Sequence, residues 1–462
     1  MNDRDWEQTM TYTISRLLFR GEGLAVSDED SHKIRIANVL PGEVVSASEP
    51  QPDETDKHAR RRFAVLNKVI QPSPDRCEAV CAHWRACPAC QFQCMHYRAQ
   101  TQFKKENWIR LLQKFCTLPE QIGFLPAIRQ IAYRCRAEAL VLGHTLGITA
   151  RPELLAILDG SKDCSAIAGD ERIIPLQSCV LQVPELNDLI TTVQEHLADF
   201  NLPQNLRISF EARDLPENEI NRRIVLYPQP EFAECTRKAG LKIVQMFGIP
   251  VILQVLPPHG SHVYPKPEAL SQTPWYGYDT DDCGHVLYAL KGAWTPVNPD
   301  NAHLIRQTIG QIVKDLPAGK VLEIGCGCGT HTSLFKDHDY TGIDASWPAI
   351  QSAQYNAAQY NWQDTNFYTD TADHYLVKRY YAGRRADIIL MHSNRLPYSQ
   401  QVAEYCKKFG AHHIIIVSPT AFALARECQY FEQLGYQIRS LTLCDTMPYT
   451  YHMMGVSHLV LV

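Results

Sequence analysis

A glycine-rich turn between two apolar segments constrains this sequence more than any other stretch. Residues 321–324 have the composition of a buried strand, and Gly325-Cys326-Gly327-Cys328-Gly329-Thr330 follows them directly. Glycine permits tight turns and lets a ligand approach the backbone where a Cβ atom would block it. A polar stretch that suits a helix start follows, and residues 340–344 then have the pattern of a second strand ending in an acid. This order predicts one half of a nucleotide-binding α/β fold, in which the acid meets ribose hydroxyls.

The spacing of the glycines indicates the kind of ligand. They alternate more tightly than in the dinucleotide-binding fingerprint, and no Gly-Lys-Ser/Thr follows them. An acid just before the glycines would repel a pyrophosphate. A cationic nucleoside without phosphate fits better, so we expect S-adenosylmethionine, and a glycine-rich turn in another kind of α/β domain is the alternative. The residues expected to bind this cofactor are Glu323, Gly325, Gly327, Gly329, Thr330 and Asp344.

Length and composition set wide limits on the rest. A chain of 462 residues is long enough for two or three domains with a large core. No apolar run would span a bilayer, and the start lacks the order of a secretory signal, so we expect a cytoplasmic protein without a membrane partner. The formal net charge of −5 gives no general argument for nucleic acid binding, so any RNA surface has to be local.

The first part of the chain has the pattern of a small β-barrel. Short alternating segments at residues 11–14, 34–39 and 43–45 are separated by turn signals. Small barrels of this kind often bind single-stranded nucleic acid. The basic run at residues 57–62 either contacts phosphates or is a solvated loop. We therefore assign residues 1–71 to an RNA-binding barrel.

Cysteines are concentrated just after this barrel. The chain has sixteen, and in a cytosolic protein clustered thiols more often hold a metal than form disulfides. Cys81, Cys87 and Cys90 follow a C-x5-C-x2-C spacing, which suits thiolate ligands of zinc or of an iron–sulfur cluster. Because no second C-x2-C is present, we favour a cluster with a distant fourth ligand, Cys179; reduced thiols without a metal are the alternative. The sequence leaves open whether three further cysteines contribute: Cys77, Cys94 and Cys164.

The remaining chain reads as two α/β regions. Residues 100–115 have a helical pattern, and residues 72–290 form a cysteine loop followed by a central α+β domain with strands near 206–210 and 252–256. In residues 291–462, near-continuous apolar strands alternate with helices, which predicts a parallel sheet covered on both faces. The expected class is therefore α/β, with a Rossmann-like C-terminal domain.

Assembled in this order, the segments resemble the bacterial RNA uracil-C5 methyltransferases, which modify ribosomal or transfer RNA. Leu40-Pro41-Gly42-Glu43 is similar to a turn of that family's TRAM barrel, and Pro74-Asp75-Arg76 with the three clustered cysteines resembles its [4Fe-4S] motif. Residues 179–184 resemble the surroundings of the fourth cluster cysteine, and residues 445–452 resemble the C-terminal motif of the family. The resemblance spans almost the whole chain. It implies RNA binding, a [4Fe-4S] cluster and a class I methyltransferase domain that uses S-adenosylmethionine.

The departures from this family concern its chemistry. The family first adds a cysteine thiolate to C6 of uracil, because C5 is a weak nucleophile. Here Pro419 stands where that cysteine is expected, and Met454 stands where the family has the glutamate that removes the C5 proton. The family's Asp-Pro-Pro-Arg becomes His392-Ser393-Asn394-Arg395, and its Phe-x-Gln-x-Asn becomes Trp294-Thr295-Pro296-Val297-Asn298. These losses argue against thiolate-assisted methylation of uracil C5.

We therefore expect a methyltransferase homologue that transfers methyl to a nitrogen or oxygen of ribosomal or transfer RNA, with His392, Asn394 and His452 as candidates for positioning the acceptor or taking its proton. One alternative is a non-catalytic iron–sulfur RNA-binding protein with a vestigial methyltransferase domain. Another keeps the uracil reaction and recruits Cys444 as the nucleophile. The sequence does not fix the oligomeric state, and a monomer is the expectation.

Overall fold

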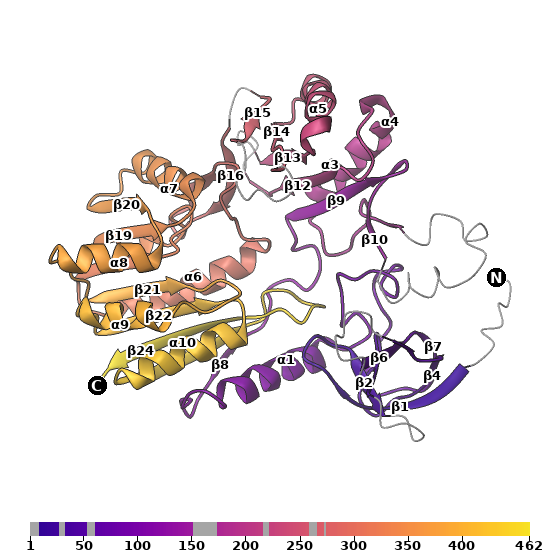
Figure 1. Cartoon of the computed structure of the whole chain (residues 1–462), viewed down its shortest axis with the longest axis horizontal. Coiled ribbons are helices and arrows are strands. Elements are labelled where there is room, and N and C mark those ends of the chain that lie inside the picture. Colours follow the sequence, from indigo (N-terminus) through magenta and orange to yellow (C-terminus); the bar gives the residue numbers. More distant parts are fainter. Residues whose placement is uncertain are drawn as a thin grey trace. The chain divides into compact units, whose positions relative to one another are not determined.

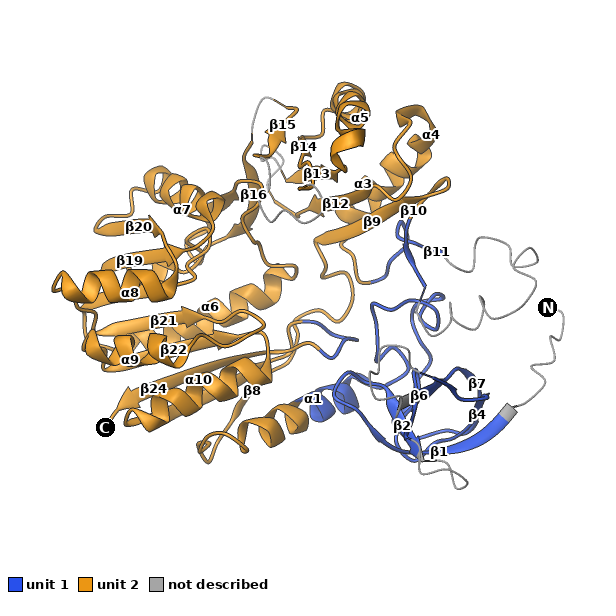
Figure 2. Cartoon of the chain, viewed as in Figure 1, with its two compact units in different colours: residues 1–104, 147–180, 447–451 blue, residues 105–146, 181–446, 452–462 orange. Residues whose placement is uncertain are grey.

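The structure is a computed structural model, and it describes residues 9–26, 33–52, 61–150, 173–215, 221–257, 266–271 and 274–462. Cys164 and residues 57–60 of the basic run lie outside these ranges. The chain divides into two compact units (Figure 2): unit 1 comprises residues 1–104, 147–180 and 447–451, and unit 2 comprises residues 105–146, 181–446 and 452–462. Within the described residues, no helix combines the length and apolar character needed to cross a bilayer.

Unit 1 contains the β-rich region expected at the start of the chain. Its seven strands follow the spatial order β5-β6-β3-β2-β1-β4-β7, and Val45 and Ala47 of β4 point into its core while their neighbours are less buried. This alternation is the two-residue period on which the strand prediction rested. The strands are β1 (Thr9–Leu17), β2 (Gly23–Val26), β3 (Lys33–Ile36), β4 (Val44–Ser48), β5 (Gln51–Pro52), β6 (Arg61–Ala64) and β7 (Leu66–Gln71).

A buried ion pair fixes the chain where it leaves these strands. The Glu43 side chain is fully buried, and its Oε2 accepts a hydrogen bond from Arg76 Nη2 at 2.7 Å and another from Leu40 N at 2.8 Å. Oε1 accepts a hydrogen bond from Ser73 N at 3.2 Å. The turn at residues 40–43 and the Pro-Asp-Arg segment are thereby held together through one carboxylate.

The central part of the chain forms a mixed sheet. In unit 2, β9, β12, β13, β14 and β15 are neighbours in that order, and only β13 and β14 run parallel. β10 (Thr145–Thr149) pairs with β11 (Ile173–Pro175). The other elements here are β9 (Arg136–Leu142), β12 (Arg207–Ala212), β13 (Arg222–Tyr227), β14 (Val251–Leu253), β15 (Glu268–Ala269), α3 (Pro184–Glu195), α4 (Leu197–Phe200), η2 (Pro230–Phe232), α5 (Ala233–Phe247) and the hairpin β16 (Tyr276–Thr280)–β17 (Val286–Ala289).

The C-terminal part forms an eight-stranded sheet in the order β20-β19-β18-β21-β22-β24-β23-β8 (Figure 1). The pairs from β20 through β22 are parallel, and β24 runs antiparallel to both neighbours. The elements are β18 (Lys320–Ile324), β19 (Asp339–Asp344), β20 (Thr365–Thr369), β21 (Ile388–His392), β22 (His413–Ser418), β23 (Tyr436–Cys444), β24 (Met454–Leu461), α6 (Pro299–Lys314), α7 (Trp347–Gln359), α8 (Ala372–Tyr381), α9 (Gln400–Lys408) and α10 (Ala421–Gln433). The predicted Rossmann-like domain is confirmed. Its strand order reverses between β18 and β21, and ligands of such sheets bind at this switch point.

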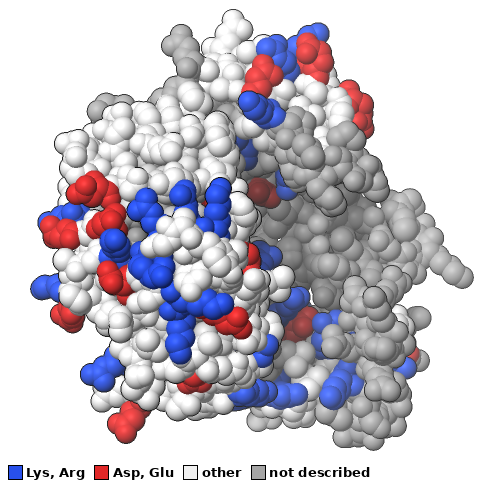
Figure 3. Space-filling view, turned by 60° about the vertical axis from the view of Figure 1, so that its left-hand side comes forward, with Lys and Arg blue, Asp and Glu red and all other residues white. Residues whose placement is uncertain are grey.

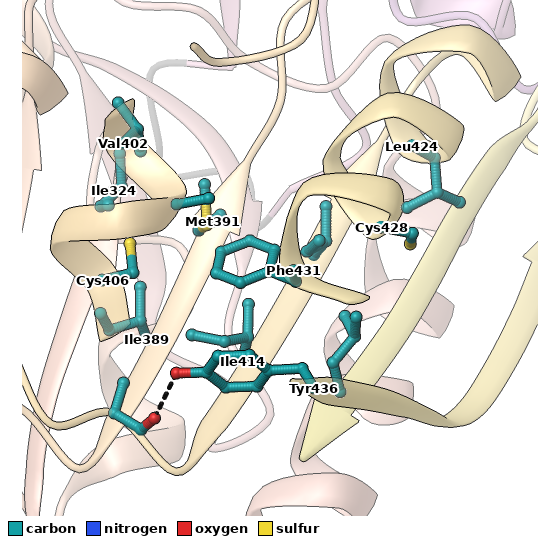
Figure 4. Packing of buried hydrophobic residues seen from close by; sticks show 14 of the residues in the cluster. Ile324, Ile389, Met391, Val402, Cys406, Ile414, Leu424, Cys428, Phe431 and Tyr436 are labelled. Carbon is teal, nitrogen blue, oxygen red and sulfur yellow. Dashed lines mark hydrogen bonds between the residues drawn. The ribbon is translucent and has the colours of Figure 1, made fainter. Parts of the chain in front are cut away.

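The apolar strands predicted in this domain lie in its core (Figure 4). Ile389 and Ile414 come from the adjacent strands β21 and β22, and they pack with Leu424 and Phe431 of α10. Tyr436 joins the same core, and its hydroxyl donates a hydrogen bond to the Ala411 carbonyl at 2.5 Å. Strands covered on both faces need apolar residues at successive positions, which explains their continuous rather than alternating pattern.

One strand of this sheet comes from far upstream. β8 (Gly123–Leu125) pairs parallel with β23, and it follows α1 (Tyr97–Leu112). Trp108 and Leu112 of that helix are buried in the same core as β21 and β22. A division at residue 291 leaves this segment out of the methyltransferase domain. A second difference is local: the helix expected after the glycine-rich turn is only the four-residue 3-10 helix η3 (Thr332–Phe335).

Candidate active site

The glycine-rich turn begins where β18 ends, at the switch point of the sheet, and part of its backbone is not covered by side chains. Gly325, Gly327 and Gly329 have φ values of 77°, 57° and 77°, a region that L side chains rarely adopt. A Cβ atom added to Gly327 would meet nothing within 4 Å, whereas one added to Gly325 would lie 3.2 Å from the Cβ of His392. The bend at Gly327 is therefore free for a ligand, and Gly325 allows β21 to come close.

Asp344 holds this turn in place. It is the last residue of β19, and its Oδ2 accepts a hydrogen bond from Gly327 N at 3.0 Å. Its Oδ1 accepts one from Ser346 N at 2.7 Å. The acid predicted to meet a ribose thus lies beside the open glycine, at the carboxyl end of the neighbouring strand.

Glu323 lies deeper than its predicted role suggests. Its side chain is fully buried, and Oε1 lies 2.7 Å from His392 Nε2 and 3.1 Å from His331 Nδ1, while Oε2 accepts a hydrogen bond from the Tyr340 hydroxyl at 2.5 Å. Burial disfavours its charged form, but the two histidines outweigh burial and lower the pKa of Glu323 below its usual value. The carboxylate therefore orients His392 at the edge of the sheet.

The other predicted residues at this edge are more dispersed. Thr330 exchanges a hydrogen bond of 2.8 Å with the Tyr278 hydroxyl, and Asn394 is exposed after β21. His452 is half-buried ahead of β24. Thr420 Oγ1 donates to the Arg395 carbonyl at 3.3 Å, so the loops that follow β21 and β22 lie side by side.

Pro419 occupies the loop between β22 and α10, beside the segment that contains His392 and Asn394. The alternative nucleophile Cys444 is buried at the end of β23, and burial raises the pKa of its thiol to about 12. Burial likewise raises the pKa of the Cys326 thiol well above its usual value. It raises the pKa of the Cys328 thiol to about 12. At neutral pH these thiols are protonated, and a thiol needs its thiolate form to attack a ring carbon.

Comparison with known proteins gives this arrangement a context. A methyltransferase-domain family model matches residues 316–432, which contain the glycine-rich turn and β18 to β22. The 23S rRNA (uracil(1939)-C(5))-methyltransferase RlmD of Vibrio campbellii is 23% identical over 460 residues, covering 95% of this chain and 93% of its own. This chain is homologous to the RNA uracil-C5 methyltransferases.

Two further proteins match this chain over nearly its full length. An uncharacterized RNA methyltransferase of Halalkalibacterium halodurans, BH0687, is 24% identical and covers 95% of this chain. The crystal structure of Pyrococcus abyssi tRNA (uracil-54, C5)-methyltransferase in complex with S-adenosyl-L-homocysteine has a TM-score of 0.72 at 16% identity and covers 98% of this chain. The chain therefore shares the fold of this tRNA methyltransferase over nearly its full length.

The cysteine pattern that resembles the RNA uracil-C5 methyltransferases lies within unit 1. Cys81, Cys87 and Cys90 follow one another through short turns, in which Trp84 N donates to the Cys81 carbonyl at 3.2 Å. Burial chiefly raises the pKa of Cys81, and the charge of Cys179 adds to this rise. Such an effect requires proximity, so Cys179 lies near Cys81 although the two are far apart in sequence.

The cysteines of this segment stand apart from the compact groups of ligand atoms among the described residues. Ligands of a tetrahedral zinc ion stand about 3.8 Å apart, since each Zn–S bond is about 2.3 Å. Within the described ranges, two groups of three ligand atoms lie within 4.8 Å of one another, and neither contains a cysteine of the C-x5-C-x2-C segment.

Several residues of this edge were not identified from the sequence. His331 appeared only as part of a polar helix start, and Tyr340 only as a strand residue. Asp370 directly follows β20, next to Asp344 at the end of β19, and its backbone N–H donates to the Asp344 carbonyl at 3.0 Å. An acid directly after a third parallel strand was a usable signal for Asp370. Nothing in the sequence distinguished His331 or Tyr340, because their roles depend on tertiary contacts with Glu323.

Proposed function

We propose that this chain transfers a methyl group from S-adenosylmethionine to a nitrogen or oxygen atom of ribosomal or transfer RNA, without a thiolate-assisted step. The observation that carries the proposal is the chemistry of the switch-point edge. Pro419 has no side-chain nucleophile, and Cys444 is buried with a pKa of about 12. Nitrogen and ribose oxygen atoms already have a lone pair to offer, so they need only positioning and an acceptor for one proton.

The glycine-rich turn supports the choice of cofactor. The open bend at Gly327 lets the adenosyl group approach the backbone, and Asp344 at the end of β19 is placed for ribose hydroxyls. The structurally similar Pyrococcus protein was crystallised with S-adenosyl-L-homocysteine, the product of this cofactor. We assign Gly325, Gly327, Gly329 and Asp344 to cofactor binding, with Glu323 acting through His392.

A rim of exposed apolar side chains around this edge supports an RNA substrate. Trp347 begins α7 and is 57% exposed, and Leu396 follows β21 and is 74% exposed. Phe422 is near the start of α10, and the carbonyl of the 65% exposed Trp294 lies 3.9 Å from Cys328 Sγ on the glycine-rich turn. Exposed aromatic rings stack on unpaired bases, and an enzyme that modifies RNA gains access to a base or ribose in this way.

A local basic surface suits a part of the RNA away from the acceptor nucleotide, because it lies at the amino-terminal edge of the parallel strands, opposite the switch-point edge. Lys and Arg side chains gather on the face that Figure 3 brings forward, although the whole chain is acidic. The last turns of α8 and α9 and the segment before β21 contribute Lys378, Arg379, Arg384, Arg385, Lys407 and Lys408. Several of these lie over tyrosine rings, such as Arg385 over Tyr380 at 5.2 Å. Positive charge interleaved with aromatic rings favours contact with an RNA backbone and its bases.

We also infer that Cys81, Cys87, Cys90 and Cys179 hold a [4Fe-4S] cluster. Their shared unit and the charge effect of Cys179 on Cys81 support this ligand set. When bound, the cluster would fasten the cysteine loop to the segment around residue 179. We give it a structural role, because the methyl transfer proposed here needs no electron.

Cofactor binding is tested by a matched pair of glycine variants. Gly327→Ala places a methyl group in the open bend and should weaken S-adenosylmethionine binding at least tenfold in calorimetry. Gly383→Ala is the control, because Gly383 also has a positive φ and nothing within 4 Å, but it lies in the turn after α8. Each variant carries the same backbone strain of about 1 kcal/mol. Equal losses in both variants would contradict the assignment of Gly327 to the cofactor site.

Methyl transfer is tested with labelled S-adenosylmethionine and total RNA from cells that lack this gene. Label in a nitrogen- or oxygen-methylated nucleoside supports the proposal. Cofactor binding without transfer to any RNA would instead support the iron–sulfur RNA-binding alternative. Label at uracil C5 that disappears in Cys444→Ala would support the alternative in which Cys444 is the nucleophile.

A further inference from the structure

Three side chains with metal-ligating atoms converge beside the glycine-rich turn. The Oε1 atom of Glu323, Nδ1 of His331 and Nε2 of His392 all lie within 4.8 Å of one another. They come from β18, from the segment before η3 and from the end of β21. The two imidazole rings are stacked, with centroids 4.7 Å apart and planes 18° apart, so both direct a nitrogen to the same oxygen.

The distances fit a shared ion after a small adjustment. Two ligands that each lie about 2.1 Å from one ion, at a right angle, stand about 3.0 Å apart. Glu323 Oε1 is 3.1 Å from His331 Nδ1, which matches, and 2.7 Å from His392 Nε2, which requires an opening of a few tenths of an ångström.

The surroundings of the three ligands resemble a built coordination site. Tyr340 donates its hydroxyl proton to Glu323 Oε2, which orients the carboxylate and leaves Oε1 toward the histidines. Glu323 is fully buried, whereas the side chains of His331 and His392 are 12% and 20% exposed. The three ligand atoms are therefore shielded from solvent on the side of the Glu323 carboxylate and accessible to solvent on the side of the two imidazole rings. An ion there would keep open positions for an exogenous ligand, as catalytic metal sites do.

We propose that Glu323, His331 and His392 bind one divalent first-row transition-metal ion as a two-histidine, one-carboxylate set. Imidazole with carboxylate suits zinc, iron and manganese better than magnesium or calcium. His392 is central, because it stands where the homologous family has an aspartate, and its imidazole completes the set.

The site also narrows the methyl acceptor, and this second part rests on the proposed function. A bound divalent ion lowers the pKa of a coordinated hydroxyl, whereas coordination of a ring nitrogen would occupy the lone pair needed for attack. In RNA the hydroxyl next to each base is the ribose 2′-OH. Its proton passes to water, the oxygen forms a bond to the methyl carbon, and the S–CH₃ bond breaks with its electrons returning to sulfur. S-adenosylhomocysteine then leaves, and the ion returns unchanged.

The site is tested by titrating Co²⁺ into the purified full chain, followed by calorimetry and by the visible difference spectrum, which removes any iron–sulfur absorption. We expect one Co²⁺ per chain with a spectrum typical of nitrogen and oxygen ligands. His331→Ala and His392→Ala should each weaken binding at least a hundredfold. His285→Ala is the control: it disrupts the other group of ligand atoms, Asp281, Cys283 and His285, and should leave this binding unchanged.

A conservative variant separates ligation from folding. His392→Gln keeps an N–H donor for Glu323 but removes the imidazole, so the thermal unfolding midpoint should stay near that of the natural chain while Co²⁺ binding is lost. Unchanged Co²⁺ binding in His392→Gln, or no Co²⁺ binding by the natural chain, would overturn the site. Because these measurements need neither S-adenosylmethionine nor RNA, they stand even if methyl transfer fails. Methylation confined to bases, with Co²⁺ bound, would overturn only the choice of acceptor.

Discussion

Glu427 is an acid in an apolar interior, on α10 near the switch-point edge. Its Oε2 accepts a very short hydrogen bond from the Ser393 hydroxyl, and its Oε1 accepts one from Tyr398 N at 2.8 Å. Burial outweighs these donors and raises the pKa of Glu427 to about 7. The folded chain thus prefers the protonated form of Glu427 below about pH 7, and the residue links folding to pH.

The sign of this linkage can be tested. An unfolded glutamate titrates near 4.5, so the folded state holds the extra proton between about pH 4.5 and pH 7, and stability falls as pH rises through that window. The full effect is on the order of 3 kcal/mol, at about 1.4 kcal/mol for each pKa unit. Glu427→Gln should flatten the pH dependence of the unfolding free energy across this window. Glu432→Gln, on the same helix, should leave the slope unchanged, and a flattening in both variants would exclude Glu427 as the cause.

Some residues of the switch-point edge were predicted from the sequence, and others were not. The place of Asp344 at the end of a second strand was predicted correctly, because strand, turn and acid follow one another in the chain. Glu323 was identified as an acid at the right place, but its full burial was not predicted. His331 and Tyr340 were missed, because their hydrogen bonds to Glu323, like that of His392, join residues on four different segments. Such convergence is a product of the fold and leaves no local pattern.

At the scale of elements, the turn at residues 40–43 and the Pro-Asp-Arg segment depend on one ion pair. Arg76→Ala would leave the fully buried Glu43 carboxylate without its cation, so we expect a loss of about 3–5 kcal/mol in the unfolding free energy of unit 1. Arg35→Ala is the control, because the Arg35–Glu22 pair is partly exposed and such pairs contribute about 1 kcal/mol or less. Denaturant titration of both variants measures the difference, and similar losses would show that burial of the Glu43 pair is not decisive.

Helices and strands were predicted correctly where the local sequence pattern of apolar residues was strong. β21 and β22 were recognised because four successive apolar residues between helices fit few other structures. η3 was expected to be a longer helix, but its chain turns toward β19 after one short segment. β8 was not predicted, since a strand of three residues carries too little periodicity to be read. Its place in the sheet depends on β23, which lies far downstream.

At the scale of the whole molecule, the proposed cluster joins cysteines that are distant in sequence. If Cys179 is its fourth ligand, Cys179→Ser should sharply lower the iron and sulfide content of anaerobically purified protein, because one ligand is lost. Cys94→Ser is the matched control, since Cys94 is buried in the apolar cluster with Phe92 and Met95. It should retain the iron and sulfide that a [4Fe-4S] cluster requires. Iron retained in Cys179→Ser but lost in Cys94→Ser would reassign the ligand.

The methyltransferase domain is likewise assembled from separated parts of the chain. A fragment of residues 291–462 lacks β8 and the apolar side chains of Trp108 and Leu112, so it exposes a strand edge and part of its core. We expect it to aggregate, and the same fragment with residues 105–126 attached by a flexible linker to be soluble and monomeric in sedimentation. A stable monomer formed by residues 291–462 alone would contradict this dependence on the upstream segment.

The upstream origin of β8 also affects how the protein is made. The ribosome releases Gly123 long before Thr442, the residue on β23 that it pairs with, and all of the central sheet is synthesised between them. Trp108 and Leu112 therefore emerge without the surface that will cover them. Closing so long a loop is slow, and apolar segments that wait in this way invite association with other chains. The nascent protein should accordingly engage chaperones until its last strands leave the exit tunnel.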